Sequence, residues 1–234
     1  MWQYRICIKG CRIRDFVIRY IRRLKQGENK VSNRKPNVTF DTNCIIDIEQ
    51  RGIPYPDLQK LVRLHNDQEI NLRVVAISAS ERMPGGYYAL NFAEFQKKIA
   101  AANLENVEIL PAIGYLDITF LDRCLTASDE MVNLERRIHE ILFQQIEFYY
   151  NDFCKMRGID PNITLTNPKW RNAKCDVLAM WSHITYDGDI FVTSDINFLK
   201  QTKKPALIAL GARDILTPQD AVIKLSSQSF TSKS

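Results

Sequence analysis

The sequence predicts an α/β fold, a three-layer α/β/α sandwich around a mostly parallel central sheet of four to five strands. Short apolar runs rich in β-branched residues alternate with longer segments whose apolar residues recur at helical spacing, which is the pattern of repeated strand–helix–strand units. Strands joined through helices run parallel, because a parallel pair needs a long crossover connection. The length of 234 residues and the hydrophobic fraction of 45% are ordinary for one globular domain with an extension.

Four apolar runs are predicted to form the core strands. They are residues 38–40, 72–78, 190–193 and 206–210, and a short run at 107–110 is a fifth candidate.

Helical spacing fills most of the chain between these runs. It predicts helices over residues 13–24, 56–71, 88–102, 131–156 and 174–186, and a last one that begins after Thr217, with Pro218 at its first position. The core domain is expected to span residues 37–225, with a helical elaboration around 103–170. The Ser-rich residues 226–234 are expected to form a flexible tail.

Residues 1–36 are predicted to be a basic amphipathic extension and linker. Residues 1–37 contain eleven Lys and Arg side chains but only Asp15 and Glu28, although the whole chain carries a formal charge of only +5. A basic arm on a slightly acidic body indicates a binding partner, most simply a polyanion, and RNA is one candidate. A helix packed on the body, or contact with an anionic membrane surface, stays an alternative. The arginines expected to bind nucleic acid are Arg12, Arg19, Arg22 and Arg23.

The cysteine and histidine pattern gives no sign of zinc or of a disulfide framework. The six cysteines contain no Cys-x-x-Cys pair, and the three histidines lie near no cysteine pair. No apolar run approaches the roughly 18 residues of a membrane-spanning helix. Arginines also interrupt every apolar cluster at the N-terminus, unlike a secretory signal. We therefore expect a reduced, cytoplasmic protein without a membrane span.

Four carboxylates are predicted to meet at one edge of the sheet. Asp41, Glu81 and Asp195 each follow a predicted strand, and Asp176 is expected to open a helix that leads back into one. The carboxyl ends of parallel strands share an edge, which is where ligands bind in such sheets. Carboxylates crowded together repel one another unless a cation joins them, and oxygen ligands suit Mg²⁺ or Mn²⁺. These residues therefore predict metal-assisted cleavage of phosphodiester bonds.

Each of these acids also has a plainer interpretation. Asp176 and Asp195 could serve only as helix caps, and Glu81 could be a solvated loop residue. It is the convergence of the four acids on one edge that favours a site.

Polar residues beside the acids are expected to support them. Asn43, Thr193 and Ser194 could hydrogen-bond the carboxylates or a metal-bound water, or could equally serve the turns in which they lie. Asp187 and Asp189 precede their strand, so we expect them at the opposite edge of the sheet and outside the site.

The chain resembles the PIN domain family over about residues 37–223. The resemblance rests on Asp41-Thr42-Asn43 after a strand, Glu81 after the next, Asp176 opening a helix, and residues 193–198 after a later strand. It implies a metal-dependent ribonuclease that acts on RNA, and the family includes the toxins of bacterial toxin–antitoxin pairs, so an antitoxin is an implied partner. By this resemblance the metal-binding catalytic acids are Asp41, Glu81, Asp176 and Asp195, with Asn43, Thr193 and Asn197 as supporting polar residues.

Two positions depart from the family pattern. Asn197 stands where many members carry a further acid. Glu81 is followed by Pro84-Gly85-Gly86, whereas the family's Glu rides on a helix, and Pro is tolerated only in a helix's first turn. The long segment between Glu81 and Asp176 is interpreted as an elaboration that gates substrate or binds a protein partner.

Two other functions are compatible with the same residues. A PIN-like module that has lost turnover would bind RNA or protein without cleaving it, and a homodimer is compatible with either form. A phosphatase of the haloacid-dehalogenase type also places Asp after its first strand, but it needs a second Asp at the position of Asn43.

Overall fold

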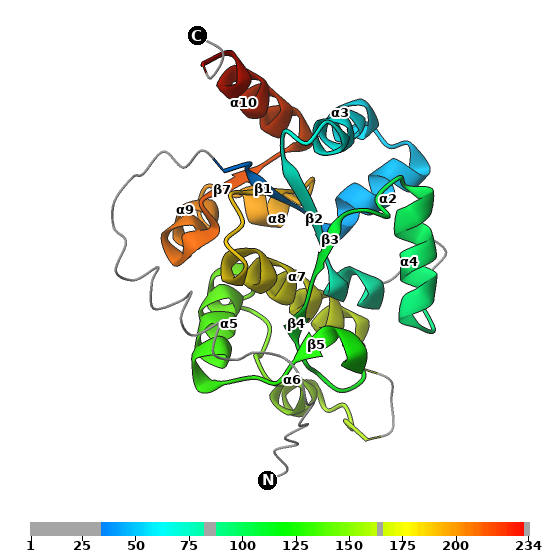
Figure 1. The fold of residues 1–234 in the computed structure, drawn as a ribbon. Coiled ribbons are helices and arrows are strands. Elements are labelled where there is room, and N and C mark those ends of the chain that lie inside the picture. Colours follow the sequence, from blue (N-terminus) through cyan, green and yellow to red (C-terminus); the bar gives the residue numbers. More distant parts are fainter. Residues whose placement is uncertain (1–33, 82–87, 163–165, 232–234) are drawn as a thin grey trace.

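The computed structural model describes residues 34–81, 88–162 and 166–231, with side chains as far as residue 227 (Figure 1). Five strands form one parallel sheet in the order β3-β2-β1-β6-β7, which confirms the predicted α/β class and its mostly parallel sheet. The strands are β1 Asn37–Phe40, β2 Asn71–Val75, β3 Glu108–Leu110, β6 Ile190–Val192 and β7 Asp214–Leu216. A second, two-stranded parallel sheet pairs β4 Ala112–Ile113 with β5 Cys124–Leu125.

The strand order contains a topological switch point between β1 and β6. From β1 the chain moves outward to β2 and β3, and later it returns to add β6 and β7 on the other side of β1. In open parallel sheets the ligand crevice lies beyond the carboxyl ends of the strands at such a point. The register pairs Phe40 with Val192, so the residues that follow these two strands emerge side by side.

Helices and single turns connect the strands. The α-helices are α2 Thr42–Gln50, α3 Tyr55–Asn66, α4 Phe92–Ala101, α5 Asp129–Leu142, α6 Tyr150–Arg157, α7 Pro168–Thr185, α8 Ile196–Leu199, α9 Lys204–Leu207 and α10 Pro218–Thr231. Two 3₁₀ turns, η1 Ala76–Ser80 and η2 Leu121–Arg123, and one π-helical turn, η3 Ile208–Ala212, complete the described elements.

The sheet buries apolar side chains on both of its faces. Ile190 and Val192 of β6 belong to a cluster with residues of α2, α3, α4 and α10. Phe191 between them belongs to a second cluster with residues of α5, α6 and α7. Successive side chains of a strand point to opposite faces, so the two clusters lie on opposite sides of β6. In Figure 1, α7 runs below the sheet between the strands and α5.

The predicted strand at residues 206–210 is wrong. These residues form the end of α9 and most of η3, and the strand that completes the sheet is β7. Of the apolar run only Leu207 is buried, while Ala206, Ile208 and Ala209 are exposed. One buried position in five residues fits a helix that lies on the surface, whereas a core strand would be buried throughout.

The predicted helix at residues 131–156 is two helices. α5 ends at Leu142 and α6 begins at Tyr150. The connection between them is fastened to neighbouring helices: the indole Nε1 of Trp170 donates to Glu147 O at 2.9 Å, and His139 Nε2 lies 2.6 Å from Ile146 O.

Other boundaries also shift. β2 ends at Val75, and the rest of the predicted strand turns into η1. α10 continues to Thr231, so residues 226–231 are helical instead of forming part of a flexible tail. α7 starts at Pro168, not at Lys174, because Asn167 caps it by accepting a hydrogen bond from Lys169 N at 3.0 Å.

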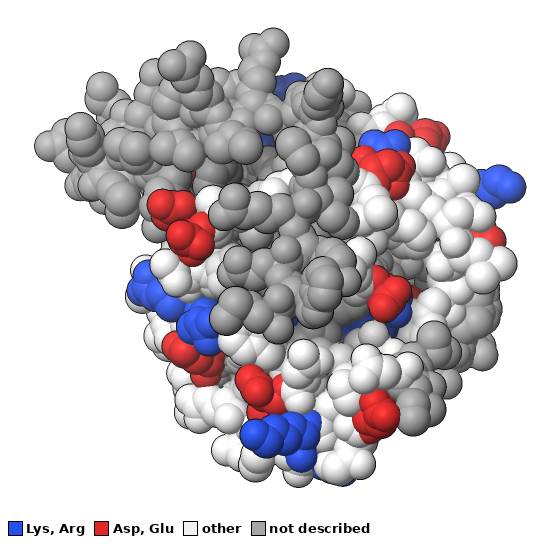
Figure 2. Space-filling model, turned by 90° about the horizontal axis from the view of Figure 1, so that it is seen from below, with Lys and Arg blue, Asp and Glu red and all other residues white. Residues whose placement is uncertain are grey.

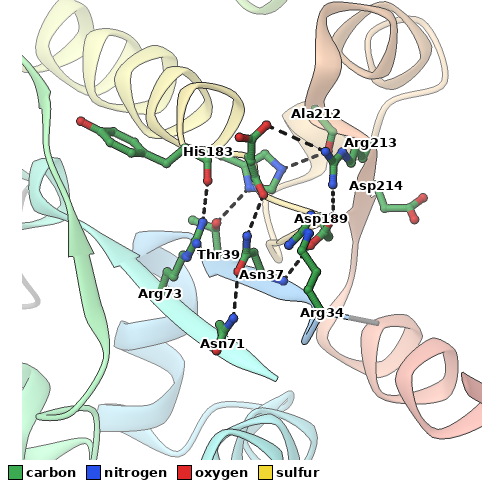
Figure 3. A network of polar contacts seen from close by, with 12 residues as sticks. Arg34, Asn37, Thr39, Asn71, Arg73, His183, Asp189, Ala212, Arg213 and Asp214 are labelled. Carbon is green, nitrogen blue, oxygen red and sulfur yellow. Dashed lines mark hydrogen bonds and ion pairs between the residues drawn. The ribbon is translucent and has the colours of Figure 1, made fainter. Parts of the chain in front are cut away.

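A polar network closes the edge of the sheet where the strands begin (Figure 3). Asp189 accepts hydrogen bonds from Asn37 N at 2.8 Å and from Arg34 Nη2 at 2.7 Å. Nearby, His183 lies between Thr39 Oγ1, at 2.9 Å from Nδ1, and Ala212 O, at 3.0 Å from Nε2. Asp189 therefore lies at the opposite edge from Asp41, as the sequence predicts.

Candidate active site

Asp41 lies at the switch point, directly beyond β1. Its backbone N–H donates to Val192 O at 3.0 Å and so continues the pairing of β1 with β6. Its side chain is 3% exposed and caps α2, because Oδ1 accepts a hydrogen bond from Thr42 N at 2.8 Å. The cap aims one carboxylate oxygen at the helix and leaves the other, Oδ2, turned toward β6.

The hydroxyl of Thr193 joins the ends of β1 and β6. It donates to Asp41 Oδ2 at 2.7 Å and accepts from Asn43 Nδ2 at 3.1 Å and from Asp195 N at 2.9 Å. Three residues are thus tied to one buried hydroxyl oxygen. Thr193 binds an acid of the cluster directly, and Asn43 reaches that acid through Thr193.

Glu81 reaches the same edge from β2 by way of η1, which it follows directly. Its Oε1 accepts a short hydrogen bond from the Thr42 hydroxyl, whose oxygen also lies 2.7 Å from Ser78 Oγ. Glu81 is only half-buried by surface area, yet protein atoms surround its carboxylate closely. It is therefore part of the cluster and not a solvated loop residue.

Asp176 contributes the third carboxylate from the middle of α7. The prediction that it opens the helix is wrong, since α7 begins eight residues earlier and Asn167 caps it. No described residue offers its carboxylate a hydrogen bond. Burial, followed by the charges of Glu81, Asp41 and Asp195, raises its pKa well above the ordinary value. The contributions of Glu81, Asp41 and Asp195 to its pKa show that Asp176 nevertheless lies near the other acids.

Asp195 caps α8 with one of its two carboxylate oxygens. Its Oδ1 accepts from Asn197 N at 2.7 Å, so the plainer interpretation as a cap is correct for this residue. Within the described part of the chain its second oxygen accepts no hydrogen bond. Because its charge raises the pKa values of Asp41 and Glu81, Asp195 belongs to the same cluster.

The cluster holds its protons unusually tightly. Burial, opposed by the hydrogen bonds from Thr193 and Thr42, raises the pKa of Asp41 to about 6. Burial and the charge of Asp41 raise the pKa of Glu81 to about 8. Such values are typical of carboxylates that share a site in which one of them stays protonated or a cation is bound.

Two of the expected supporting residues do something else. Ser194 is exposed and serves the turn, where its backbone N donates to Asn43 Oδ1 at 3.2 Å and its hydroxyl to Asp47 Oδ2 at 3.2 Å. Asn197 accepts a hydrogen bond at Oδ1 from Lys203 Nζ, which also donates to Leu142 O at 2.5 Å. A lysine thus faces the position at which the family pattern has a further acid.

The donor set fits a hard divalent cation by its chemistry. Asp41, Glu81, Asp176 and Asp195 offer only oxygen, and both oxygens of Asp176 have no protein partner within the described ranges. The Ser80 hydroxyl, 1% exposed, is likewise buried without a hydrogen bond. Yet no three His, Cys, Asp or Glu side chains of the described residues stand close enough together, as placed, to hold one metal ion.

Sequence reasoning missed three residues of this site. Thr42 ties Glu81 to the end of β1, Lys203 holds Asn197, and Arg171 binds the main chain beside Glu81. Thr42 carried a signal, since a hydroxyl directly after a strand-terminal Asp is well placed to bind a neighbouring acid. Arg171 and Lys203 carried none, because their contacts depend on how distant segments pack.

The fold and the acid cluster together define an α/β protein with a buried carboxylate site at the switch point of a parallel sheet. No protein-family model matches the chain, and no curated protein or solved structure resembles it significantly. None of the helices within the described ranges combines the length and hydropathy needed to cross a bilayer.

The charged side chains around the described surface are mixed. On the face shown in Figure 2, Lys and Arg alternate with Asp and Glu in small groups. The arginines predicted to bind nucleic acid, Arg12, Arg19, Arg22 and Arg23, lie outside the described residues.

Proposed function

We propose that this protein is a metal-dependent endoribonuclease of the PIN type, with Asp41, Glu81, Asp176 and Asp195 as its catalytic, Mg²⁺- or Mn²⁺-binding acids. The observation that carries the proposal is the free carboxylate of Asp176, which faces Asp41 and Glu81 with no hydrogen bond to any described residue. Asp176 is half-buried, and the charges of Glu81, Asp41 and Asp195 oppose its ionisation. A divalent cation would offset that repulsion. The two apolar clusters on opposite sides of β6 support a three-layer sandwich.

The chain's own residues would orient the site. Thr193 and Thr42 N hold both oxygens of Asp41, and the Thr42 hydroxyl holds one oxygen of Glu81. A bound cation would supply an activated water and would stabilise the leaving oxygen of the phosphodiester. Rotation of the Asp176 side chain, which no hydrogen bond restrains among described residues, would let the acids close on that cation.

A second candidate function is a module that binds RNA or a protein partner, such as an antitoxin or a second copy of the chain, without turnover. The observation that favours it is the Lys203–Asn197 contact, which places a cationic side chain beside the end of β6 instead of a further acid.

The proposal is tested by incubating the purified protein with a mixed set of labelled RNAs in Mn²⁺, Mg²⁺ or EDTA. Internal cleavage that requires a divalent metal supports the nuclease. Retention of RNA with no cleavage under any of the three conditions favours the binding module.

Metal-free stability should fall as pH rises, because the fold raises the pKa values of three acids of the cluster, Asp41, Glu81 and Asp176. Glu81 goes from 4.5 to about 8 and Asp41 from 3.8 to about 6. Between the unfolded and folded values the native state binds more protons, so the free energy of unfolding decreases with pH through this window. From pH 5 to pH 8 we expect a loss of several kcal/mol in EDTA, measured by urea unfolding.

The matched variant for this prediction is Glu81→Gln, which cannot ionise. The variant should gain stability relative to the wild type as pH rises, and Mn²⁺ should stabilise the wild type more at pH 8 than at pH 5. A difference between the two proteins that stays constant across this range would show that Glu81 does not titrate there.

The basic arm should supply much of the RNA affinity. Replacing Arg12, Arg19, Arg22 and Arg23 by Gln should weaken RNA binding and flatten its dependence on salt, since fewer phosphate contacts release fewer counterions. For single-stranded RNA the slope of log K against log salt should fall by up to about 3, measured by fluorescence anisotropy.

The control for the arm is an equal loss of charge from the exposed surface of the body. An unchanged salt slope in the arm variant, or an equal change in the control, would remove the arm from RNA binding. The control residues, also changed to Gln, are Arg63, Lys97, Arg137 and Lys155, all exposed.

A further inference from the structure

The main chain beside Glu81 is weakly held by its own turn. Glu81 follows η1, a single 3₁₀ turn, and its backbone N–H reaches Ser78 O only at 3.5 Å, the limit of a hydrogen bond. Its carboxylate is fixed by the Thr42 hydroxyl alone among described residues. Something outside η1 must therefore hold this segment if Glu81 is to keep its place in the cluster.

Arg171 provides that hold from α7. Its Nε donates to Ser80 O at 2.9 Å, and its Nη1 donates to Asp117 O at 2.8 Å. The guanidinium carbon lies 4.1 Å from the centroid of the Tyr88 ring, which it stacks against. One planar side chain of α7 thus contacts Ser80, Tyr88 and Asp117, all more than 50 residues earlier in the sequence. Only the forked, rigid geometry of arginine allows both hydrogen bonds at once.

We propose that Arg171 is a positioning residue of the acid site: through the carbonyl of Ser80 it sets the place of Glu81 relative to Asp176. The helix α7 thus positions both acids: it carries Asp176 itself, and Arg171, five residues earlier on the same helix, holds the segment that precedes Glu81. The inference deepens the proposed function and rests on it.

The role of Arg171 is one of geometry and not of charge. Among the described residues, its guanidinium forms hydrogen bonds to two main-chain carbonyls, and no carboxylate lies within ion-pair distance of it. Arg171 therefore does not neutralise the acids of the site, and another cation would have to do so. Groups that orient metal ligands typically change metal affinity by 10- to 100-fold when they are removed.

The test compares Arg171→Lys and Arg171→Gln with the wild type by calorimetric titration with Mn²⁺ and by RNA cleavage over a range of Mn²⁺ concentrations. We expect Mn²⁺ to bind about 10-fold or more weakly to either variant. Cleavage should be lost at low Mn²⁺ and restored at high Mn²⁺, a rescue that a purely structural residue would not show. Arg171→Lys should bind Mn²⁺ no better than Arg171→Gln, since the forked guanidinium and not the positive charge makes the two hydrogen bonds.

The matched control is Arg157→Lys on α6. Arg157 also donates to a main-chain carbonyl, Phe153 O, at 3.1 Å and also stacks on a ring, but no acid of the site is nearby in its contacts. Its Mn²⁺ affinity should equal that of the wild type.

The outcomes separate the two proposals. If the wild type binds Mn²⁺ and cleaves RNA while both Arg171 variants match it, the positioning role is wrong and the nuclease stands. If the wild type neither binds Mn²⁺ nor cleaves RNA, the proposed function fails, and the inference about Arg171 fails with it. If Arg171→Gln does not fold, Tyr88→Leu replaces it in the comparison, because it removes the stacked ring and leaves both hydrogen bonds possible. Mn²⁺ affinity equal to that of the wild type in both Arg171→Lys and Tyr88→Leu would then overturn the positioning role.

Discussion

Asp41→Asn should abolish metal-dependent RNA cleavage while leaving the fold intact. The substitution keeps the shape of the side chain and an oxygen for Thr42 N, so α2 keeps its cap. It removes the negative charge from a side chain that is 3% exposed at the centre of the acid cluster. Loss of a metal ligand at a catalytic centre costs several kcal/mol of transition-state stabilisation, so we expect the rate to fall by about 10³-fold or more.

The measurement is the single-turnover cleavage rate in Mn²⁺, with circular dichroism and thermal unfolding on the same samples. The matched control is Asp152→Asn, which removes an exposed acid on α6 and should leave the rate unchanged. The metal-free variant should be at least as stable as the wild type, because a carboxylate whose pKa the fold raises opposes folding once it ionises. An unfolded variant would show that Asp41 is structural, and a folded, active one would remove it from the chemistry.

The ends of the strands were predictable because strand register follows from short, fully buried runs. Phe40 pairs with Val192, so Asp41 and Thr193 emerge as neighbours once β1 and β6 lie side by side. Each run is apolar and is followed by a polar residue, which marks the edge of the sheet in the sequence alone. The positions of Asp41 and Asp195 therefore needed no tertiary information beyond a parallel sheet.

The helix that carries Asp176 was harder to bound. The signal for its start was present in Asn167-Pro168, a cap followed by Pro at the first helical position, but the apolar periodicity is clearest from Val177 onward. Residues 206–210 were misassigned for a related reason: five consecutive apolar residues look like a buried strand, and only their burial shows that they form a surface helix.

Side-chain contacts between distant segments could not be predicted from the sequence. Arg171 binds the carbonyl of Ser80, 91 residues earlier, and Lys203 binds that of Leu142, 61 residues earlier. Neither contact leaves a local pattern, because one depends on how α7 packs against η1 and the other on how the start of α9 packs against the end of α5. Such contacts decide the geometry of the acid site, whereas the sequence pattern decides only which acids reach it.

The helical elaboration should depend for its stability on one buried ion pair between α5 and α7. Lys174 Nζ lies 2.6 Å from Glu135 Oε1, and the two side chains are 1% and 0% exposed. Tyr115 donates its hydroxyl proton to the same carboxylate at 2.7 Å, and the Lys174 ammonium lies 4.0 Å from the centroid of the Phe148 ring. Burial lowers the pKa of Lys174, and the charge of Glu135 opposes that shift.

Lys174→Met should therefore destabilise the protein by about 3–5 kcal/mol, because it leaves the Glu135 carboxylate buried without its cation. The double variant Lys174→Met/Glu135→Leu should recover much of that loss, since a buried pair replaced by apolar side chains is often close to neutral. The control is Lys60→Met, which breaks the surface pair with Asp57 and should cost about 0.5 kcal/mol or less. All are measured by urea unfolding.

The same variants separate stability from chemistry. Lys174 lies two residues before Asp176 on α7, but its side chain binds α5 and not the acid cluster. If the pair only fixes α5 against α7, the double variant should cleave RNA at close to the wild-type rate, although the single variant unfolds easily. A stable double variant that has lost cleavage would instead mean that the pair orients α7, and with it Asp176, for catalysis. A single variant as stable as Lys60→Met would show that neither charge matters to the packing of these helices.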